Sequence, residues 1–473
     1  MKIRLVNPGL LLALLTGLLP TGRAAAQTFA NLHNFTGGTN GANPMSGLII
    51  SSGVLYGTTT EMTAGSTNGG TVFKLNADGT GFTNLCEFTD LGPRAVYGFM
   101  PQAGLLLSGN TLYGSTSGDN GSGGSTLFAI NTDGTDLKNL HGFSENGPDG
   151  DDPWGVLVLS GQTLYGTAVQ GGVYENGTVF KINTGGTGYH TLLSFTNAAS
   201  PYAGLVVAGN LLFGTTQGDG AAGNGTVFVV NTNGTGFTNL HSFTATLGTL
   251  ATNGDGTVPN AGLLLSGGVL YGATAGGGLL GGGTLFALNV DGTGFTNLHL
   301  FYVLGGGGAV PNGLILAGGA LYGTTATGGT NGTGTVFTLG TNGSGFKTLY
   351  EFSARSTSAP YTTNRDGATP MAGLLWSSNT LYGTTVGGGS LGDGTVFSLT
   401  LPDSTPRLNI VRSGPQIVLS WPTNAAGFTL RSTTNLAPPA VWSTVVPARV
   451  VVNGEYVVTN SISGPRRYYQ LSQ

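Results

Sequence analysis

Short stretches in which apolar and polar residues alternate recur along most of the chain, at intervals of about fifty positions. Each interval contains the phrase Leu-Tyr-Gly or its Phe variant, and the seven copies lie at 55–57, 112–114, 164–166, 212–214, 270–272, 321–323 and 381–383. A second phrase, Gly-Thr-Val-Phe or a close variant, follows each copy and ends at Phe73, Phe128, Phe180, Phe228, Phe286, Phe337 and Phe397. Alternation with a period of two predicts strands, and a repeat of this length is typical of propeller blades.

The fifth repeat shows how four strands, which we call a to d, fit into one interval. Its alternating runs predict strands over 262–266, 269–274, 283–289 and 295–301. We expect Gly267-Gly268 to form a tight turn between a and b, and Asp291-Gly292 to form one between c and d, because both pairs readily adopt the positive φ that tight hairpins need. The b–c and d–a links are longer, and we call them the long loops. In an up-and-down blade they leave from the same end, where we expect binding residues.

A strand of type d, 29–35, precedes the first complete repeat, whereas the last repeat ends after its strand c at 394–400. We therefore expect the N-terminal strand to pair into the last blade, which removes the exposed edges of an open array. The pattern predicts an all-β fold in which 27–402 form a seven-bladed β-propeller closed by its N-terminal strand.

The period stops in the last segment, 403–473, although β-type runs continue at 416–421, 427–432, 442–446 and 456–459. This segment is similar to the small fibronectin-III-like or immunoglobulin-like β-sandwiches that are appended to exported bacterial proteins. Trp421 and Trp442 could form a platform for a sugar ring or pack in the core, and core packing is the favoured interpretation.

Residues 1–26 have the pattern of a secretory signal peptide, with Lys2 and Arg4 before an apolar run and three alanines at 24–26. The apolar run is too short to span a bilayer, and no later segment is long and apolar enough. Cys86 is the one cysteine, which excludes an intramolecular disulfide. We expect an exported protein, located outside the cell, on the cell surface or in the periplasm of a bacterium.

Composition and charge restrict the partners of this protein. Glycine supplies 87 of 473 residues, which would suggest disorder without the strict period that places glycine at turns. Residues 27–402 contain seven Lys or Arg and 18 Asp or Glu, whereas the last segment contains six Arg and two acids. An acidic main body argues against nucleic acid as its partner. We expect a monomer without a transmembrane segment.

The two phrases together resemble the Gloeobacter/Verrucomicrobia (GloVer) tandem repeats of exported bacterial proteins. The matching residues run, for example, from Leu381-Tyr382-Gly383-Thr384-Thr385 to Gly394-Thr395-Val396-Phe397. The resemblance covers about 27–400 and implies an exported, propeller-like protein. It implies no catalytic residues. Members of the family are often tethered by varied C-terminal anchors, and none is evident in this sequence.

Four d–a loops share an Asx-Gly-x-x-Pro pattern, at 40–44, 149–153, 255–259 and 366–370. The favoured interpretation is a turn in which the Asx side chain bonds to the backbone ahead of the proline. The candidate binding residues of these loops are Asp149, Asp151, Asp152, Trp154, Asp255, Arg365 and Asp366. A calcium site formed by Glu145, Asp149, Asp151 and Asp152 is a further hypothesis, because four carboxylates lie close together, although without EF-hand spacing. We expect no other cofactor.

Four histidines, His33, His141, His241 and His299, occupy equivalent positions in strand d of different repeats. We expect structural roles, because different blades hold them too far apart to share one ion. Motifs of serine hydrolases, phosphate loops and zinc proteases are missing from the sequence. The sequence favours a non-catalytic protein that binds a polysaccharide or an envelope or extracellular protein through its long loops. The alternative is a carbohydrate-active hydrolase or lyase that uses loop carboxylates.

Overall fold

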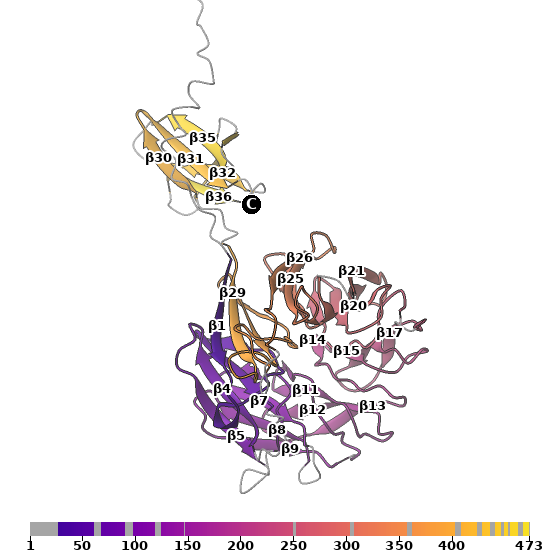
Figure 1. Cartoon of the computed structure of the whole chain (residues 1–473). Helices are drawn as coiled ribbons and strands as arrows, with labels where there is room; N and C mark the ends of the chain where they lie inside the picture. The colour runs from indigo at the N-terminus through magenta and orange to yellow at the C-terminus, as the bar shows by residue number, and fades with distance from the viewer. Residues whose placement is uncertain are drawn as a thin grey trace, which may run out of the picture. The chain divides into compact units, whose positions relative to one another are not determined.

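The structure, a computed structural model, describes residues 27–60, 68–89, 98–118, 124–145, 147–248, 252–302, 307–356, 362–402, 408–422, 428–435, 440–445, 449–452, 455–461 and 467–472. These residues form an all-β fold (Figure 1). One short 3-10 helix, Gly38–Asn40, accompanies the strands. Contacts divide the chain into a repeat unit, Phe29–Leu399, and a second unit that comprises Met1–Thr28 and Thr400–Gln473; the described residues of Thr400–Gln473 are here called the C-terminal unit. The expected signal peptide, 1–26, lies outside the described residues.

The strands of the repeat unit form seven antiparallel sheets. The first sheet contains β2 (Ile49–Ser51), β3 (Val54–Thr59), β4 (Asn68–Asn76) and β5 (Thr83–Thr89), and the second contains β6 (Leu106–Ser108), β7 (Thr111–Thr116), β8 (Thr126–Asn131) and β9 (Lys138–Gly142). The third contains β10 (Val158–Ser160), β11 (Thr163–Ala168), β12 (Thr178–Asn183) and β13 (His190–Ser194), and the fourth contains β14 (Val206–Ala208), β15 (Leu211–Thr216), β16 (Thr226–Asn231) and β17 (Thr238–Ser242). The fifth sheet contains β18 (Leu264–Ser266), β19 (Val269–Thr274), β20 (Gly281–Asn289) and β21 (Thr296–Tyr302). The sixth contains β22 (Ala309–Pro311), β23 (Ile315–Ala317), β24 (Ala320–Thr327), β25 (Thr335–Gly340) and β26 (Lys347–Glu351). The seventh contains β27 (Leu375–Ser377), β28 (Thr380–Thr385), β29 (Thr395–Thr400) and β1 (Thr28–Asn34).

The repeated phrases are explained by packing inside each sheet. Gly272 of β19 is directly opposite Phe286 of β20, and the other six sheets repeat this Gly–Phe pair. A Cβ atom on these glycines would lie 2.3–2.6 Å from the tip of the Phe ring, so only glycine leaves room for the ring. The Leu before the Tyr-Gly pair and the Phe ring are both fully buried, or nearly so, in every repeat. The phrases therefore belong to the scaffold.

The first and last repeats of the repeat unit are in direct contact. The N-terminal strand β1 pairs with β29, so the seventh sheet has the order β1-β29-β28-β27 (Figure 1). The hydroxyl of Thr384 in β28 also donates a hydrogen bond of 2.9 Å to the carbonyl of Ser46, just before the first sheet. Equivalent hydroxyls join consecutive repeats, as where Thr167 donates to the carbonyl of Ala203 at 3.0 Å.

The C-terminal unit contains two antiparallel sheets, both of which contribute to a small core around Trp421. Their orders are β30-β31-β35-β34 and β33-β32-β36. The strands are β30 (Asn409–Ser413), β31 (Gln416–Pro422), β32 (Thr429–Thr433), β33 (Ser443–Thr444), β34 (Val450–Val452), β35 (Glu455–Ser461) and β36 (Tyr468–Ser472). Trp421 is 1% exposed and packs with Leu419, Leu430 and Val458 from both sheets. Trp421 is thus a core residue and cannot serve as a sugar platform, whereas Trp442 is half-buried.

Candidate functional site

The two long loops of a repeat lie side by side at one end of its sheet. In the third repeat, Asp151 of the d–a loop forms a bridge with Gln170 of the b–c loop. Thr257 and Gly276 form the same bridge in the fifth repeat, and Ala368 and Gly387 form it in the seventh. The a–b and c–d turns are at the opposite end of the strands, which we call the short-turn end. The long loops therefore define one surface of each repeat, the long-loop end.

Each d–a connection contains a strained residue directly before its proline. These residues have φ values of 45–59° and are Asn43, Met100, Asp152, Ser200, Val258, Val310 and Thr369. A positive φ is unusual for a β-branched residue and for a residue before proline. Two backbone hydrogen bonds hold Val258 in place, from its N–H to the carbonyl of Asn224 at 3.1 Å and from Ala275 N–H to its own carbonyl at 3.0 Å. The sequence did not predict this feature, whose one signal is the recurring proline.

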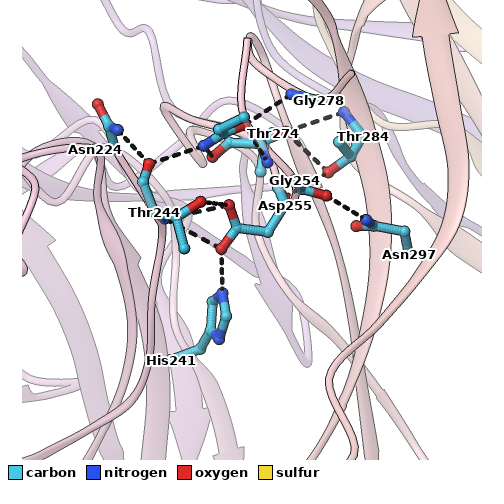
Figure 2. Close-up of polar contacts among 11 residues, drawn as sticks. Asn224, His241, Thr244, Gly254, Asp255, Thr274, Gly278, Thr284 and Asn297 are labelled. Carbon is cyan, nitrogen blue, oxygen red and sulfur yellow. Dashed lines mark hydrogen bonds and ion pairs between the residues drawn. The ribbon is translucent and has the colours of Figure 1, made fainter. Parts of the chain in front are cut away.

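The Asx residues of the d–a loops fasten the end of the preceding strand d. In the fifth repeat, the carboxylate of Asp255 lies 3.0 Å from Nε2 of His241 and accepts the backbone N–H of Thr244 at 3.1 Å (Figure 2). The Thr244 hydroxyl donates to the same carboxylate. Asn253 accepts the N–H groups of Gly256 and Gly278 at 2.8 and 2.9 Å, which ties the d–a loop to the b–c loop. Asp255 and Asn253 are buried, and their side chains are paired within the fold.

The other three Asx loops repeat this arrangement with different residues. Nε2 of His141 lies 3.0 Å from Asp149, and Nε2 of His33 lies 3.2 Å from the side-chain oxygen of Asn40. Tyr350 donates to Asp366 at 2.7 Å, and the Ser353 N–H donates to the same carboxylate at 3.0 Å. The ring partners stack on rings of the following repeat, 3.7–4.1 Å apart, in the pairs His33–Phe82, His141–Tyr189, His241–Phe295 and Tyr350–Phe29. These contacts give the histidines structural roles.

Burial controls the protonation of several of these rings. It lowers the pKa of His299, and it lowers the pKa of His33 against the opposing effect of the Asn40 hydrogen bond. Burial, followed by the hydrogen bond and charge of Asp366, raises the pKa of Tyr350. Because the phenol therefore keeps its proton, Tyr350 is the donor and Asp366 the acceptor.

The four carboxylates of the calcium hypothesis have separate surroundings. Asp149 pairs with His141, Asp151 accepts from the Ser125 hydroxyl, and Asp152 accepts from the Gln170 side chain at 2.8 Å. Glu145 is exposed in the turn ahead of them. Across the described ranges, no group of three or more His, Cys, Asp or Glu side chains is placed to hold a metal ion. The calcium site stays a prediction from the sequence.

The remaining candidates, Trp154 and Arg365, also lie in d–a loops. The ring of Trp154 is half-buried and meets the ring of Tyr202 edge to face, with centroids 4.9 Å apart. The side chain of Arg365 is exposed, and its carbonyl accepts a hydrogen bond of 3.1 Å from Asn31. The two residues belong to different repeats, the third and the seventh. No contact in the described residues brings them together.

Sequence comparison identifies the family of this chain. The profile of the Gloeobacter/Verrucomicrobia repeat matches residues 92–254 and 246–413, which is more than half of the chain. The chain belongs to this family of repeat proteins. A comparison with curated proteins gives no match.

Several solved structures are similar to this Gloeobacter/Verrucomicrobia repeat protein in backbone. One is an oligogalacturonate lyase in complex with manganese, with 11% identity and a TM-score of 0.48, covering 82% of this chain and 99% of that one. Another is an oligogalacturonate lyase from Vibrio parahaemolyticus, with 10% identity and a TM-score of 0.47, covering 80% and 98%. A chain of a nidogen–laminin complex has 14% identity and a TM-score of 0.38, covering 63% and 93%. No activity or metal is carried over from these proteins.

Exposed apolar side chains of this Gloeobacter/Verrucomicrobia repeat unit gather at the long-loop end. Among the described residues, nine of its ten exposed large apolar side chains lie in or directly beside the long loops: Val156, Val173, Tyr174, Leu247, Val258, Leu279, Tyr302, Met371 and Leu391. The tenth, Phe237, is at the short-turn end and is in contact with the Phe195 ring. Leu247, Val173 and Leu279 are 74%, 69% and 66% exposed. Exposed large apolar side chains are therefore concentrated at one end of the described part of the repeat unit.

The charges of the repeat unit are divided between its two ends. Lys74, Lys138, Lys181 and Lys347 all lie beside the c–d turns, at the short-turn end. Eleven of the fifteen acids in the described part lie in or beside the long loops, where Arg355 and Arg365 are the basic residues. Since the lysines are remote from these acids, the long-loop end carries a negative field. No helix in the described part of the chain is long and apolar enough to cross a membrane.

Proposed function

We propose that this protein is a non-catalytic binding protein that recognises a polysaccharide or an envelope or extracellular protein through its long-loop end. The observation that carries the proposal is the excess of exposed apolar side chains at that end. The repeated phrases form the interior of the sheets, whereas the loop residues differ from repeat to repeat. A rigid scaffold that presents variable loops is a common arrangement for binding.

We further infer that the seven sheets close into a seven-bladed ring, and that the C-terminal unit is a fibronectin-III-like or immunoglobulin-like sandwich. The pairing of β1 with β29 and the hydrogen bond from Thr384 to Ser46 support closure. The two-sheet core around Trp421 supports the sandwich. Export of the protein rests on the signal-like sequence of 1–26.

The alternative, a hydrolase or lyase, needs two carboxyl groups facing one glycosidic bond. Asp149, Asp255 and Asp366 belong to different repeats, and each is paired with a ring of the preceding strand d and, for two of them, with a backbone N–H. Their arrangement supports a structural role over a catalytic one. Binding therefore remains the function that we propose.

The test is a glycan and envelope-protein array probed with the mature protein. We expect at least one hit that the double variant Leu247→Ser/Leu279→Ser weakens, because both side chains are exposed in long loops. Asp136→Asn, an exposed change at the short-turn end, is the control and should leave the hit unchanged. An array without hits, or hits that the loop variant does not affect, would reject the proposal. Release of reducing ends or unsaturated products from any arrayed glycan would favour the enzyme.

A further inference from the structure

The long-loop end combines exposed apolar side chains with an excess of negative charge. The third repeat shows both features in two adjoining loops, 143–157 and 169–177. Val173 and Tyr174, 69% and 55% exposed, stand next to Glu175, which is also exposed. The opposite loop supplies Glu145 and Asp152, and the sequence of both loops contains no Lys or Arg.

The two loops of the third repeat are held in fixed positions. The N–H of Gly172 donates to the carbonyl of Gly147 at 2.8 Å, and the side chain of Gln170 donates to Asp152 at 2.8 Å. Backbone bonds between Asp151 and Gln170 run in both directions, at 2.9 and 3.1 Å. Because the loops are tied to each other, the backbone that carries Val173, Tyr174 and Glu175 is fixed relative to the backbone of Asp152, so the two loops form one surface and less entropy is lost on binding.

We propose that this surface binds a basic polypeptide, in which Lys or Arg side chains alternate with apolar ones; the inference rests on the proposed binding function and names its partner. An ammonium or guanidinium group is attracted electrostatically by the face of the Tyr174 ring and by the adjacent carboxylates. Apolar side chains of the same polypeptide cover Val173 and the ring edge. An anionic polysaccharide such as a polyuronate is repelled by this end, and a neutral polysaccharide makes no use of its charge.

The charge division of the whole repeat unit favours the same partner. The lysines are confined to the short-turn end, so a basic polypeptide that approaches the long-loop end meets acids without nearby lysines. Such an arrangement orients a cationic partner before contact and raises its association rate at low salt. The apolar side chains then provide the contact area.

Four probes test the inference: a Lys–Leu peptide, a Glu–Leu peptide of equal length, a neutral cello-oligosaccharide and an oligogalacturonate. We expect the mature protein to bind the Lys–Leu peptide alone, and about ten-fold more weakly when salt rises from about 50 mM to about 500 mM. Glu145→Gln/Glu175→Gln should weaken binding about five-fold, and Val173→Ser/Tyr174→Ser about ten-fold. Asp78→Asn/Asp136→Asn removes two acids from the short-turn end and is the matched control, with unchanged binding.

Each outcome has a defined meaning. A Lys–Leu peptide that fails to bind, or that binds equally to all variants, overturns the inference. Binding of the cello-oligosaccharide or the oligogalacturonate that Val173→Ser/Tyr174→Ser removes also overturns it, but leaves the proposed function standing. The proposed function itself falls only through the array, so the two failures are distinguishable. Thermal melting of each variant confirms that it is folded.

Discussion

Asp255 fastens several groups at the long-loop end. Asp255 is 6% exposed, and its carboxylate holds His241 together with the backbone and hydroxyl of Thr244. The equivalence of the four histidines was visible in the sequence, and so was the recurring Asx residue. The pairing of each Asx side chain with a histidine could not be seen in the sequence, because it depends on how far strand d extends before the chain turns back. The stacking of His241 on Phe295 depends in addition on the spacing between repeats.

Replacing Asp255 tests its structural role. Asp255→Ala should lower the free energy of unfolding by about 2 kcal/mol, because the Thr244 N–H and the His241 ring lose a buried acceptor. Asp255→Asn keeps one acceptor and should cost less. Denaturant titrations of both variants provide the measurement, with the exposed Asp78→Asn as control. Equal stability of Asp255→Ala and the control would show that the carboxylate is not structural.

Gly272 tests the packing of the repeated phrase. Its Cβ position lies 2.3 Å from the ring of Phe286, so Gly272→Ala should destabilise the protein by about 1–3 kcal/mol through overpacking. Gly185→Ala is the matched control, since nothing lies within 4 Å of the Cβ that it adds and its φ is not positive. The second change Phe286→Leu should restore part of the loss in a thermal melt. A neutral Gly272→Ala variant would contradict the packing explanation.

His299 gives the repeat unit a dependence on pH. Burial lowers its folded pKa below the unfolded value, so its contribution to stability is complete above the unfolded pKa, about 6.5, and is lost as pH falls through the folded pKa. His33 acts in the same direction. The melting temperature should fall between about pH 7.5 and about pH 5, and less so in His299→Phe, which keeps a ring against Phe346. An identical pH profile for both proteins would remove His299 as a cause.

At the scale of elements, the sequence predicted strands well and loop backbone poorly. For the fifth repeat, the predicted strand 269–274 is β19 itself, because alternation and flanking turns mark both of its ends. The predicted strand 262–266 was wrong at its start, since β18 begins at Leu264. Strand β22 was not predicted, because its residues continue the pairing of β24 and have no alternation of their own. The positive φ values before the prolines are equally invisible, since residues such as Val258 rarely adopt them.

Removing strand β1 tests how much this strand contributes to the stability of the repeat unit. Deleting Thr28–Asn34 exposes the edge of β29 and removes Phe29, which stacks on Tyr350 at 4.1 Å. The truncated protein should lose more than about 3 kcal/mol of stability and should aggregate through the exposed edge. A synthetic peptide of this sequence, added in trans, should restore the melting temperature, whereas a scrambled peptide should not. Full stability of the truncated protein would mean that β1 contributes nothing to the fold.

At the scale of the repeat unit, most of the described acids and of the exposed large apolar side chains lie at the long-loop end, whereas the four lysines lie at the short-turn end. Composition predicted the acidic body, and loop lengths predicted the end that carries variable residues. The division of charge could not be read from composition, because it depends on which strand end each residue occupies. The ligand could not be predicted from the sequence either, since the seven long-loop pairs differ from one another in length and chemistry.

The last prediction concerns export, because the site of signal cleavage decides whether strand β1 is kept to pair with β29. Cleavage after Ala26 leaves a single residue, Gln27, before β1, so the mature chain keeps the whole strand that pairs with β29. When the full chain is produced in a bacterium, mass spectrometry of the exported protein should therefore find an N-terminus at Gln27. Lys2→Glu/Arg4→Glu removes the positive start of the signal and should retain the protein inside the cell. An exported chain that begins beyond Asn34 would contradict the prediction, because the seventh sheet would then lack β1.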